Sequence, residues 1–531
     1  MAPRGSLLVA SALGVLAFSA CGDEPSGPAS FIPPDAPLYI EARVQPDDEQ
    51  RDALAELAGR LVELPIVGRV ADPFEMLEEE IDRAASDAGV DFSFSEDVEP
   101  WLGDWGAMAV SSEALTGASG GESDAGFMVA LEVSDAEAAR DALERFAEEG
   151  DDVEAAEFAG VEGITGDELY AAVVDDTLIA APTEEDFEAA LGAHDGDSLA
   201  GADGFEQAFA GLDADDALAR AYLDFGTVLE AAAEGDLEGL QITQGAIPEI
   251  TGQLGAALYV RDDGLALDYS APGEATGGSE ALRAASADAV AAIGIAGVGS
   301  LLRDSVARVE QAGAATDQLS EGQLAAAFQA LTGVSLDDAA AALGDGTLQL
   351  LGELPDAFAV GLRVDVNDAG TVGSLLGGLE GFFDMDETAA VGPPLAGDSG
   401  FSAQPSRKAD PETPIEFVAA ETDGETLTAV VASGADEARE AIEPDGGALG
   451  DDPDFQAAAE ALGDDFEPLA FARPGALLRG ILGGGSVLDL IASGSAEDAI
   501  PAFIASKLGW LIAGMRGEGE RTVTRVVVGV E

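Results

Sequence analysis

The second half of the chain repeats, in the same order, short motifs of the first half. Four pairs carry the repeat: Trp101-Leu-Gly-Asp104 with Ala342-Leu-Gly-Asp345, Val129–Val133 with Val360–Val364, Asp195–Leu199 with Asp445–Leu449, and Leu254-Gly255 with Leu508-Gly509. The offset drifts from 231 residues (Val129 to Val360) to 254 residues (Leu254 to Leu508). Self-similarity over so long a period indicates duplication. The fold must therefore build one arrangement twice.

Each half contains both strand and helix patterns. In the first half, alternating apolar residues predict strands, and apolar residues spaced three or four apart predict amphipathic helices. The predicted strands are 38–44, 107–111, 127–133, 169–175, 177–181, 220–225, 256–260 and 265–269, and the predicted helices are 51–64, 73–88, 135–146 and 184–191. Ser134 and Thr183 are the expected N-caps of the last two helices. Short turns between strands favour antiparallel pairing, so the sequence predicts an α+β fold.

We expect two tandem copies of one domain, each a mainly antiparallel sheet packed with helices. The first copy is predicted at 35–271 and the second at 288–531, with a linker at 272–287. The second copy contains a Pro- and Gly-rich insertion at 392–414, which includes Arg407-Lys408 and is predicted to be an exposed loop absent from the first copy.

The N-terminus has the pattern of an exported protein. Arg4 precedes an apolar run at 7–18, which is shorter than the roughly 20 residues that a membrane span needs. It fits the apolar region of a signal peptide, predicted at 1–20. Two other apolar stretches, Ala289–Leu302 and Ala499–Met515, are interrupted by glycines or a lysine and are expected in the core.

Cys21, the single cysteine, follows the apolar run directly, after Ser19 and Ala20. This arrangement resembles the lipobox of bacterial lipoproteins, although Phe18 stands where that motif usually has leucine. The resemblance implies a diacylglyceryl group on Cys21, and the residues that follow predict a flexible tether at 21–34. The alternative is an ordinary secretory leader with a cysteine placed there by chance.

Charge excludes several classes of partner. The chain has 104 acidic and 23 basic side chains and a net charge of −81. Such a surface repels nucleic acid and anionic headgroups, so we expect contact with the bilayer through the Cys21 anchor alone, and diffuse cation binding. One cysteine and one histidine exclude intramolecular disulfides, zinc fingers and histidine-rich metal sites.

Two serine motifs resemble those of hydrolases. Gly196-Asp-Ser-Leu199 spells the nucleophile block of GDSL-type esterases, but no histidine follows Ser198, and Ala448 stands at the matching place in the second half. Gly117–Gly121, with Ser119, fits a nucleophile elbow but precedes a predicted strand where an elbow needs a helix. We interpret both as structural segments.

His194 and two acidic clusters are the remaining candidates. His194 beside Asp195 is expected to act as a favourable charge at a helix C-terminus. The clusters Asp213–Asp216 and Asp384–Glu387 offer oxygen ligands for Ca²⁺ but lack the glycine and glutamate of a calcium loop. The sequence therefore predicts no catalytic residue, no cofactor and no metal site.

Cys21, the segment Pro34–Ala42, the Trp101–Asp104 motif and the strand–helix Val129–Phe146 together resemble a bacterial lipoprotein family. Its members are known from high-GC Gram-positive bacteria and contain a domain of unknown function. The resemblance covers most of the mature chain and implies location and architecture, without an activity or a ligand.

We therefore expect a lipid-anchored protein on the extracytoplasmic face of the bacterial cell membrane, acting as a non-enzymatic scaffold or interaction protein. One alternative is a binding module for an apolar or cell-envelope ligand between the two repeats. The other is a hydrolase that uses carboxylates alone, marked by a facing carboxylate pair of which one has a raised pKa.

Overall fold

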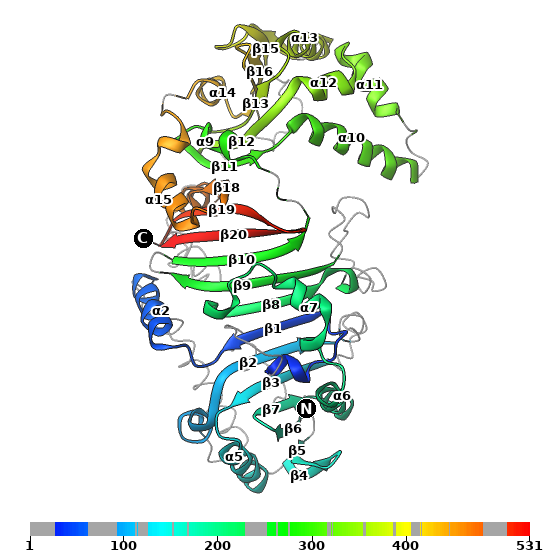
Figure 1. Ribbon diagram of the computed structural model, residues 1–531. Coiled ribbons are helices and arrows are strands. Elements are labelled where there is room, and N and C mark those ends of the chain that lie inside the picture. Colours follow the sequence, from blue (N-terminus) through cyan, green and yellow to red (C-terminus); the bar gives the residue numbers. More distant parts are fainter. Residues whose placement is uncertain are drawn as a thin grey trace, which may run out of the picture. The chain divides into compact units, whose positions relative to one another are not determined.

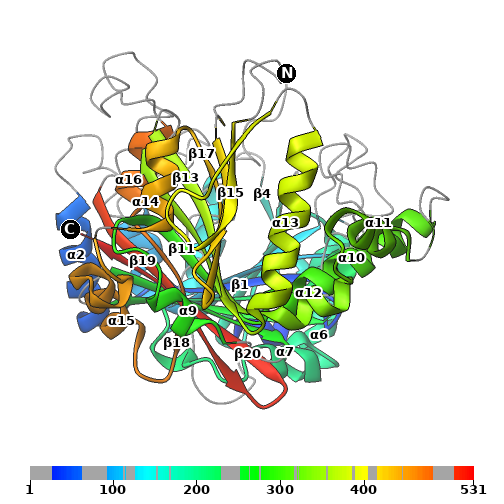
Figure 2. The same cartoon turned by 90° about the horizontal axis from the view of Figure 1, so that it is seen from above.

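The computed structural model describes residues 27–61, 93–111, 114, 126–150, 153–166, 169–228, 252–261, 264–273, 275, 277–315, 320, 322–353, 357–385, 389–404, 415, 417–444, 446–481 and 507–530 (Figures 1 and 2). The chain divides into two compact units. The first contains Met1–Ile242, Glu249–Glu274 and Gly517–Val523, and the second contains Thr243–Pro248, Ala275–Arg516 and Thr524–Glu531. Both mix helices with antiparallel sheet, as the sequence predicted.

The first unit is built on ten described strands, each antiparallel to its neighbours. They are β1 (Leu38–Arg43), β2 (Leu102–Val110), β3 (Phe127–Val133), β4 (Val153–Phe158), β5 (Val161–Gly166), β6 (Leu169–Val174), β7 (Thr177–Ala181), β8 (Ala219–Asp224), β9 (Gln253–Arg261) and β10 (Gly264–Pro272). Their order across the sheet is β4-β5-β6-β7-β3-β2-β1-β8-β9-β10.

Helices cover both faces of this sheet. They are α2 (Asp48–Leu61), α5 (Ala136–Glu149), α6 (Glu184–Asp195) and α7 (Asp203–Ala208), with short helical turns η1 (Pro28–Phe31), η3 (Phe94–Val98), η4 (Glu99–Trp101), η5 (Leu199–Gly201) and η6 (Ala214–Asp216). Ala139 and Ala142 of α5 pack on Val129 and neighbouring residues of one face. Because side chains alternate along a strand, Met128 faces the other way, into the core under α6.

The second unit is built in a similar way. Its strands are β11 (Ala289–Ile295), β12 (Leu343–Glu353), β13 (Ala357–Val366), β14 (Ala390–Gly392), β15 (Ser399–Gln404), β16 (Phe417–Thr422), β17 (Thr426–Ala432), β18 (Glu467–Ala472), β19 (Leu508–Glu518) and β20 (Arg521–Val530). The order is β14-β15-β16-β17-β13-β12-β11-β18-β19-β20, antiparallel in every pair whose register is described.

The helices of the second unit are α9 (Ser279–Arg283), α10 (Val298–Ala315), α11 (Gln323–Thr332), α12 (Leu336–Ala342), α13 (Ala369–Met385), α14 (Ala435–Ile442), α15 (Pro453–Leu462) and α16 (Pro474–Ile481), with the turn η7 (Leu449–Asp451). Val372 and Leu376 of α13 pack with Phe401 on one face of the sheet. Ala438 and Ala441 of α14 pack on the other face, so the two helices lie on opposite sides (Figure 2).

Helix starts agree with the sequence at one position and differ at another. Thr183 caps α6 by accepting from the N–H of Asp186, as predicted. The prediction of Ser134 as the cap of α5 is wrong. The helix begins at Ala136, so Asp135 occupies the capping position and its carboxylate accepts from the N–H groups of Glu137 and Ala138.

Three predicted connecting segments are partly packed structure. The tether 21–34 already contains η1, where Phe31 and Ile32 are buried. The linker 272–287 contains α9, with Leu282 buried. The predicted loop 392–414 contains β15, because Phe401 is drawn into the core beneath α13. In each case one or two large apolar side chains bury the segment in a core that was assembled from distant residues.

The two apolar stretches that were expected in the core form strands and part of a helix where the structure describes them. The apolar stretch Ala289–Leu302 forms β11 and the start of α10, and Leu508–Met515 belongs to β19. The predicted helix 73–88 and the segment 499–506 lie outside the described residues. Among the helices that the structure describes, none has both the length and the apolar character needed to cross a bilayer.

Candidate functional site

Cys21, the predicted lipidation site, lies outside the described residues, which begin with residue 27 and the packed turn η1. Phe31 and Ile32, at the end of η1, are 2% and 0% exposed. The carbonyl of Ile32 accepts from the N–H of Leu199 at 2.8 Å, which joins η1 to η5. Pro28 follows Cys21 by seven residues, so the connection spans at most about 25 Å.

His194 occupies the last turn of α6, next to η1. Its ring stacks on Phe31 with centroids 4.1 Å apart and planes 7° from parallel. Its Nε2 lies 3.1 Å from Oδ2 of Asp175 in the β6–β7 turn. The predicted position at a helix C-terminus is therefore correct, and the stacking on Phe31 is an addition that sequence reasoning missed.

The GDSL-like serine does not form a triad with His194. Ser198 is the residue before η5, and the ring nitrogen of His194 faces Asp175. Leu199, the last residue of the motif, is fully buried, and so is Leu449 at the matching place in the second unit. Burial of this leucine is a packing role that the two units share at this motif.

The other sequence candidates give no metal site in the described part of the chain. Among the residues that the structure describes, no group of three or more His, Cys, Asp or Glu side chains is arranged to hold a metal ion. Asp213–Asp216 covers the turn η6 and the residue before it. Ser119, Asp386, Glu387, Arg407 and Lys408 lie outside the described residues.

Glu132 of β3 is a partly buried carboxylate whose pKa is raised in the folded protein. The pairing of β2 with β3 is irregular between Leu102 and Gly106, which forms a bulge beside Glu132. Burial raises the pKa of Glu132, the charges of Asp104 and Glu41 raise it further, and hydrogen bonds from the backbone of the bulge oppose the rise. Its Oε2 is buried without a hydrogen-bond partner among the described residues.

The nearby Glu41 forms a buried ion pair with Arg220. Glu41 and Arg220 lie opposite one another on β1 and β8, and Arg220 Nε donates to Glu41 Oε2 at 2.5 Å. The guanidinium group also lies over the rings of Phe205 and Phe209, at 5.8 and 5.2 Å. An ion pair in such a site is costly to break because either charge would be left buried.

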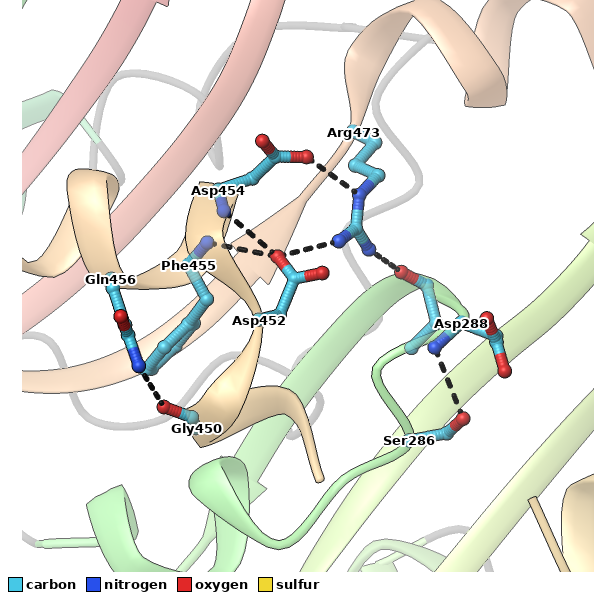
Figure 3. A network of polar contacts seen from close by, with 9 residues as sticks. Ser286, Asp288, Gly450, Asp452, Asp454, Phe455, Gln456 and Arg473 are labelled. Carbon is cyan, nitrogen blue, oxygen red and sulfur yellow. Dashed lines mark hydrogen bonds and ion pairs between the residues drawn. The ribbon is translucent and has the colours of Figure 1, made fainter. Parts of the chain in front are cut away.

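A second polar network surrounds Arg473, which follows β18 (Figure 3). The guanidinium forms ion pairs with Asp452 at 2.9 Å and with Asp454 at 3.6 Å, and it donates a hydrogen bond to the backbone carbonyl of Ala289. Asp452 also caps α15 by accepting from the N–H groups of Asp454 and Phe455. The network thus ties α15 to the start of β11.

Each unit has a sheet face whose cross-strand rows are apolar, unlike the acidic composition of the chain. In the first unit, one cross-strand row on this face consists of Tyr269, Ala256, Ala221, Ile40 and Met108. On the same face of β1, β8, β9, β10 and Gly106–Val110 of β2, no residue is charged. Leu267 and Tyr269 of this face are each 41% exposed.

The second unit has an equivalent apolar row. It consists of Ala513, Ala470, Ile293, Leu348 and Leu362. Ile293 is 45% and Leu348 39% exposed. Each of these two sheet faces therefore presents apolar side chains to solvent.

The comparisons with known proteins identify a family. A model described as a protein of unknown function, DUF3352, matches residues 5–363, more than half of the chain. The chain belongs to the DUF3352 family. A family of unknown function was expected from the sequence. Lipid attachment and a high-GC Gram-positive source stay predictions. No curated protein matches the chain.

Solved structures add little to this assignment. The chain is similar to crystal form I of TP0453 with a TM-score of 0.25, and to crystal form III with a TM-score of 0.24. Each is 9% identical and covers 48% of this DUF3352 chain, with 79% and 81% of TP0453 covered. These scores are too low to assign a shared fold.

Proposed function

We propose that this DUF3352 protein is a lipoprotein, anchored through Cys21 to the extracytoplasmic face of the bacterial cell membrane, and that it acts as a non-enzymatic scaffold or interaction protein. The observation that carries the proposal is the single cysteine, placed directly after a signal-peptide-like run and two small residues. The packing of η1 supports it, because a short connection from Cys21 leads into a buried turn.

The anchor is tested by mass spectrometry of the membrane fraction. We expect the mature chain to begin with a diacylglyceryl-modified Cys21 and the Cys21→Ala variant to appear in the medium. Ser30→Ala, a change beyond the motif, is the matched control and should stay on the membrane. A Cys21→Ala chain that remains membrane-bound would rule the anchor out.

We also infer that the two units are copies of one domain. The order of strand pairing in one unit repeats in the other, strand for strand. Strands β2 and β12 each begin with an irregularity in their pairing with the next strand. It lies between Leu102 and Gly106 in β2, and between Leu343 and Gly346 in β12. The bond from Leu199 to Ile32 has a counterpart in the bond from the N–H of Leu449 to the carbonyl of Ala285, at 2.7 Å.

The strand pairing moves the match between β3 and β13 by two residues from the match that the sequence motifs indicate. The motif alignment placed Leu131 opposite Leu362, whereas the pairing of Gly106 with Leu131 and of Gly346 with Val364 matches Leu131 to Val364. The shift is two residues, so each side chain keeps its face of the sheet. An experimental structure in which the two strand orders differ would overturn the duplication.

The apolar sheet faces favour a second candidate function, binding of an apolar ligand. The observation is the uncharged face of the first unit with Leu267 and Tyr269 exposed. A fluorescent fatty acid titrated into the full chain tests it. We expect Leu267→Glu to abolish binding and Glu144→Gln, on the exposed side of α5, to leave it unchanged. Failure of the fatty acid to bind would remove this candidate.

The carboxylate-only hydrolase receives less support. Glu132 has the raised pKa that such an enzyme requires. Its neighbour Glu41, however, is held by Arg220, and a glycosidase needs a second carboxylate that is free to act as a nucleophile or base.

A further inference from the structure

Strand β4 is an edge strand of the first unit's sheet. Among the strands that the structure describes, it pairs with β5 alone, and it ends the sheet on that side (Figure 1). Its antiparallel register is regular from Val153 opposite Gly166 to Phe158 opposite Val161, without a bulge or a proline. A strand in this position presents a row of backbone N–H and C=O groups with which a further strand can pair.

The turn between β4 and β5 decides which backbone groups face outward. Ala159 and Gly160 form this turn with φ angles of 49° and 91°, and a type I′ hairpin turn requires positive φ at both of these positions. The flanking residues Phe158 and Val161 therefore share a hydrogen-bonded pair, and such pairs recur at every second residue of an antiparallel ladder. The residues whose N–H and C=O groups point away from β5 are Val153, Ala155 and Glu157.

The outward row of β4 is open to solvent. Ala155 and Glu157 are exposed, and Glu154 between them is exposed on the opposite face of the strand. The methyl group of Ala155 is too small to shield the backbone groups on either side of it. The row can therefore be reached by another extended chain.

The matching edge of the second unit is protected in ways that β4 is not. The order of the strands makes β14 the counterpart of β4, and β14 has three residues, Ala390–Gly392. Pro393 and Pro394 follow it directly, and a proline has no N–H to donate to a further strand. Short strands, prolines and charged side chains all keep sheet edges from pairing. Strand β4 has only the charges, which repel a partner of the same sign but attract one of opposite sign.

The charge along β4 is acidic on both faces of the sheet. Glu154 and Glu157 are three residues apart, so their side chains lie on opposite faces. Residues 146–219 contain neither lysine nor arginine, and Arg145 of α5 is paired with Asp97 at 2.6 Å. A second copy of this chain would place the same acidic edge against this one, and like charges on neighbouring strands are destabilising. A strand with basic side chains gains an ion pair on each face instead.

We propose that β4 is a docking edge for an extended basic segment of another protein, which adds to the sheet as a further strand. The segment carries lysine or arginine at two positions three residues apart, one beside Glu154 and the other beside Glu157. Backbone hydrogen bonds along the edge supply the affinity, and the two glutamates select the charge of the partner. The proposal rests on the role as an interaction protein proposed above, and it names the chemistry of the partner.

A basic peptide added to the full chain tests the docking edge. The probe is a short peptide of valine and threonine with lysine at every third position. Amide hydrogen exchange is the measurement, because a peptide held by charge alone leaves the backbone groups of β4 unpaired. We expect saturating peptide to slow exchange at the N–H groups of Ala155 and Glu157 by about tenfold or more. The same peptide with N-methyl groups on alternate amides keeps its charge but cannot donate along the edge, so it should give no such protection.

Substitutions on β4 separate backbone pairing from charge. Ala155→Pro removes an outward N–H without removing a bond to β5, and it should weaken peptide binding by about tenfold. Replacing Glu154 and Glu157 together by glutamine should weaken binding by about threefold to tenfold. Glu144→Gln, at an exposed position of α5, is the matched control for the change in net charge and should leave the affinity unchanged.

Three results would overturn the proposal. They are no protection by the unmodified peptide, equal protection by the N-methylated peptide, and a dimer that protects the same amides without peptide, which would assign the edge to a second copy. If Ala155→Pro does not fold, the two peptides compared on the unmodified chain still decide. The test requires neither Cys21 nor a membrane, so its failure and the failure of the lipid anchor are distinguishable.

Discussion

Gly103 lies directly against the side chain of Glu132. A Cβ atom at Gly103 would stand 2.7 Å from Cγ and 2.9 Å from Cβ of Glu132, closer than such atoms approach in folded proteins. The bulge of β2 can therefore approach β3 because residue 103 has no side chain. At the matching position of the second unit, Gly344 is less crowded, with the nearest atom, Cβ of Asp365, at 3.2 Å.

Gly103→Ala should destabilise the protein by about 1–3 kcal/mol, because the new methyl group forces the bulge or the strand to move. Gly344→Ala is the matched control and should cost less, since a small shift relieves its contact. Chemical denaturation monitored by circular dichroism measures both. An equal loss of stability in the two variants would show that the backbone at Gly103 can move away from Glu132 without destabilising the protein.

Glu132→Gln should become more stable relative to the unmodified chain as the pH rises from acid to neutral. Burial raises the folded-state pKa of Glu132 above its unfolded value. A raised pKa contributes stability that is fully present below the unfolded pKa and is lost as the pH rises through the folded pKa. The glutamine is uncharged throughout, so the variant avoids this loss.

The measurement is the free energy of unfolding of Glu132→Gln and of the unmodified chain between pH 4 and pH 7. The difference should shift in favour of the variant as the pH rises. Glu144→Gln, at an exposed position of α5, controls for the change in net charge. A difference that does not change with pH would show that ionised Glu132 is fully compensated by the N–H groups of the bulge.

Arg473→Met should destabilise the protein by about 2 kcal/mol, since it removes the ion pairs with Asp452 and Asp454 and leaves the mostly buried Asp452 with its helix-cap contacts alone. Arg439→Met is the control, because its pair with Asp436 is on the surface, with 50% and 95% of the two side chains exposed. Exposed pairs contribute about 0–1 kcal/mol. Thermal unfolding should rank the two variants in this order, and the reverse order would contradict the network.

Stability should increase with ionic strength. The net charge of −81 makes the compact state repel itself, and raising NaCl from about 10 mM to 1 M shortens the screening length from roughly 30 Å to 3 Å. We expect the melting temperature to rise over this range, and to rise more steeply with MgCl2 at equal ionic strength. A flat or falling melting temperature would mean that the carboxylates are far enough apart, or paired closely enough, for their repulsion not to destabilise the folded protein.

Local patterns in the sequence were sufficient for the strands whose apolar residues alternate. Phe127–Val133 and Thr177–Ala181 are strands over the predicted residues, and the helix pattern after Ser134 was displaced by only one residue. These segments carry their own signal because side-chain alternation reflects which face is buried.

Segments without such a signal needed the tertiary structure. The strands β4 and β5 were missed, because Glu154, Glu157 and Glu162 interrupt any apolar alternation. They form by pairing with one another and with β6, whose backbone groups supply the hydrogen bonds. Strand β15 lies in a segment rich in proline and glycine, which gave no strand pattern. It forms because Phe401 packs in the core under α13.

The sequence by itself determined the types of the elements with a clear apolar period, the repeated order of motifs, the acidic composition and the position of the single cysteine, since each depends on residues close together in the chain or on composition. The tertiary structure decided that Phe31 stacks on His194, that Gly103 lies on Glu132 and that Arg473 ties α15 to the start of β11. These contacts join residues between 29 and 184 positions apart (Gly103 to Glu132, and Ala289 to Arg473). No local pattern specifies them, because burial of the whole sheet brings the partners together.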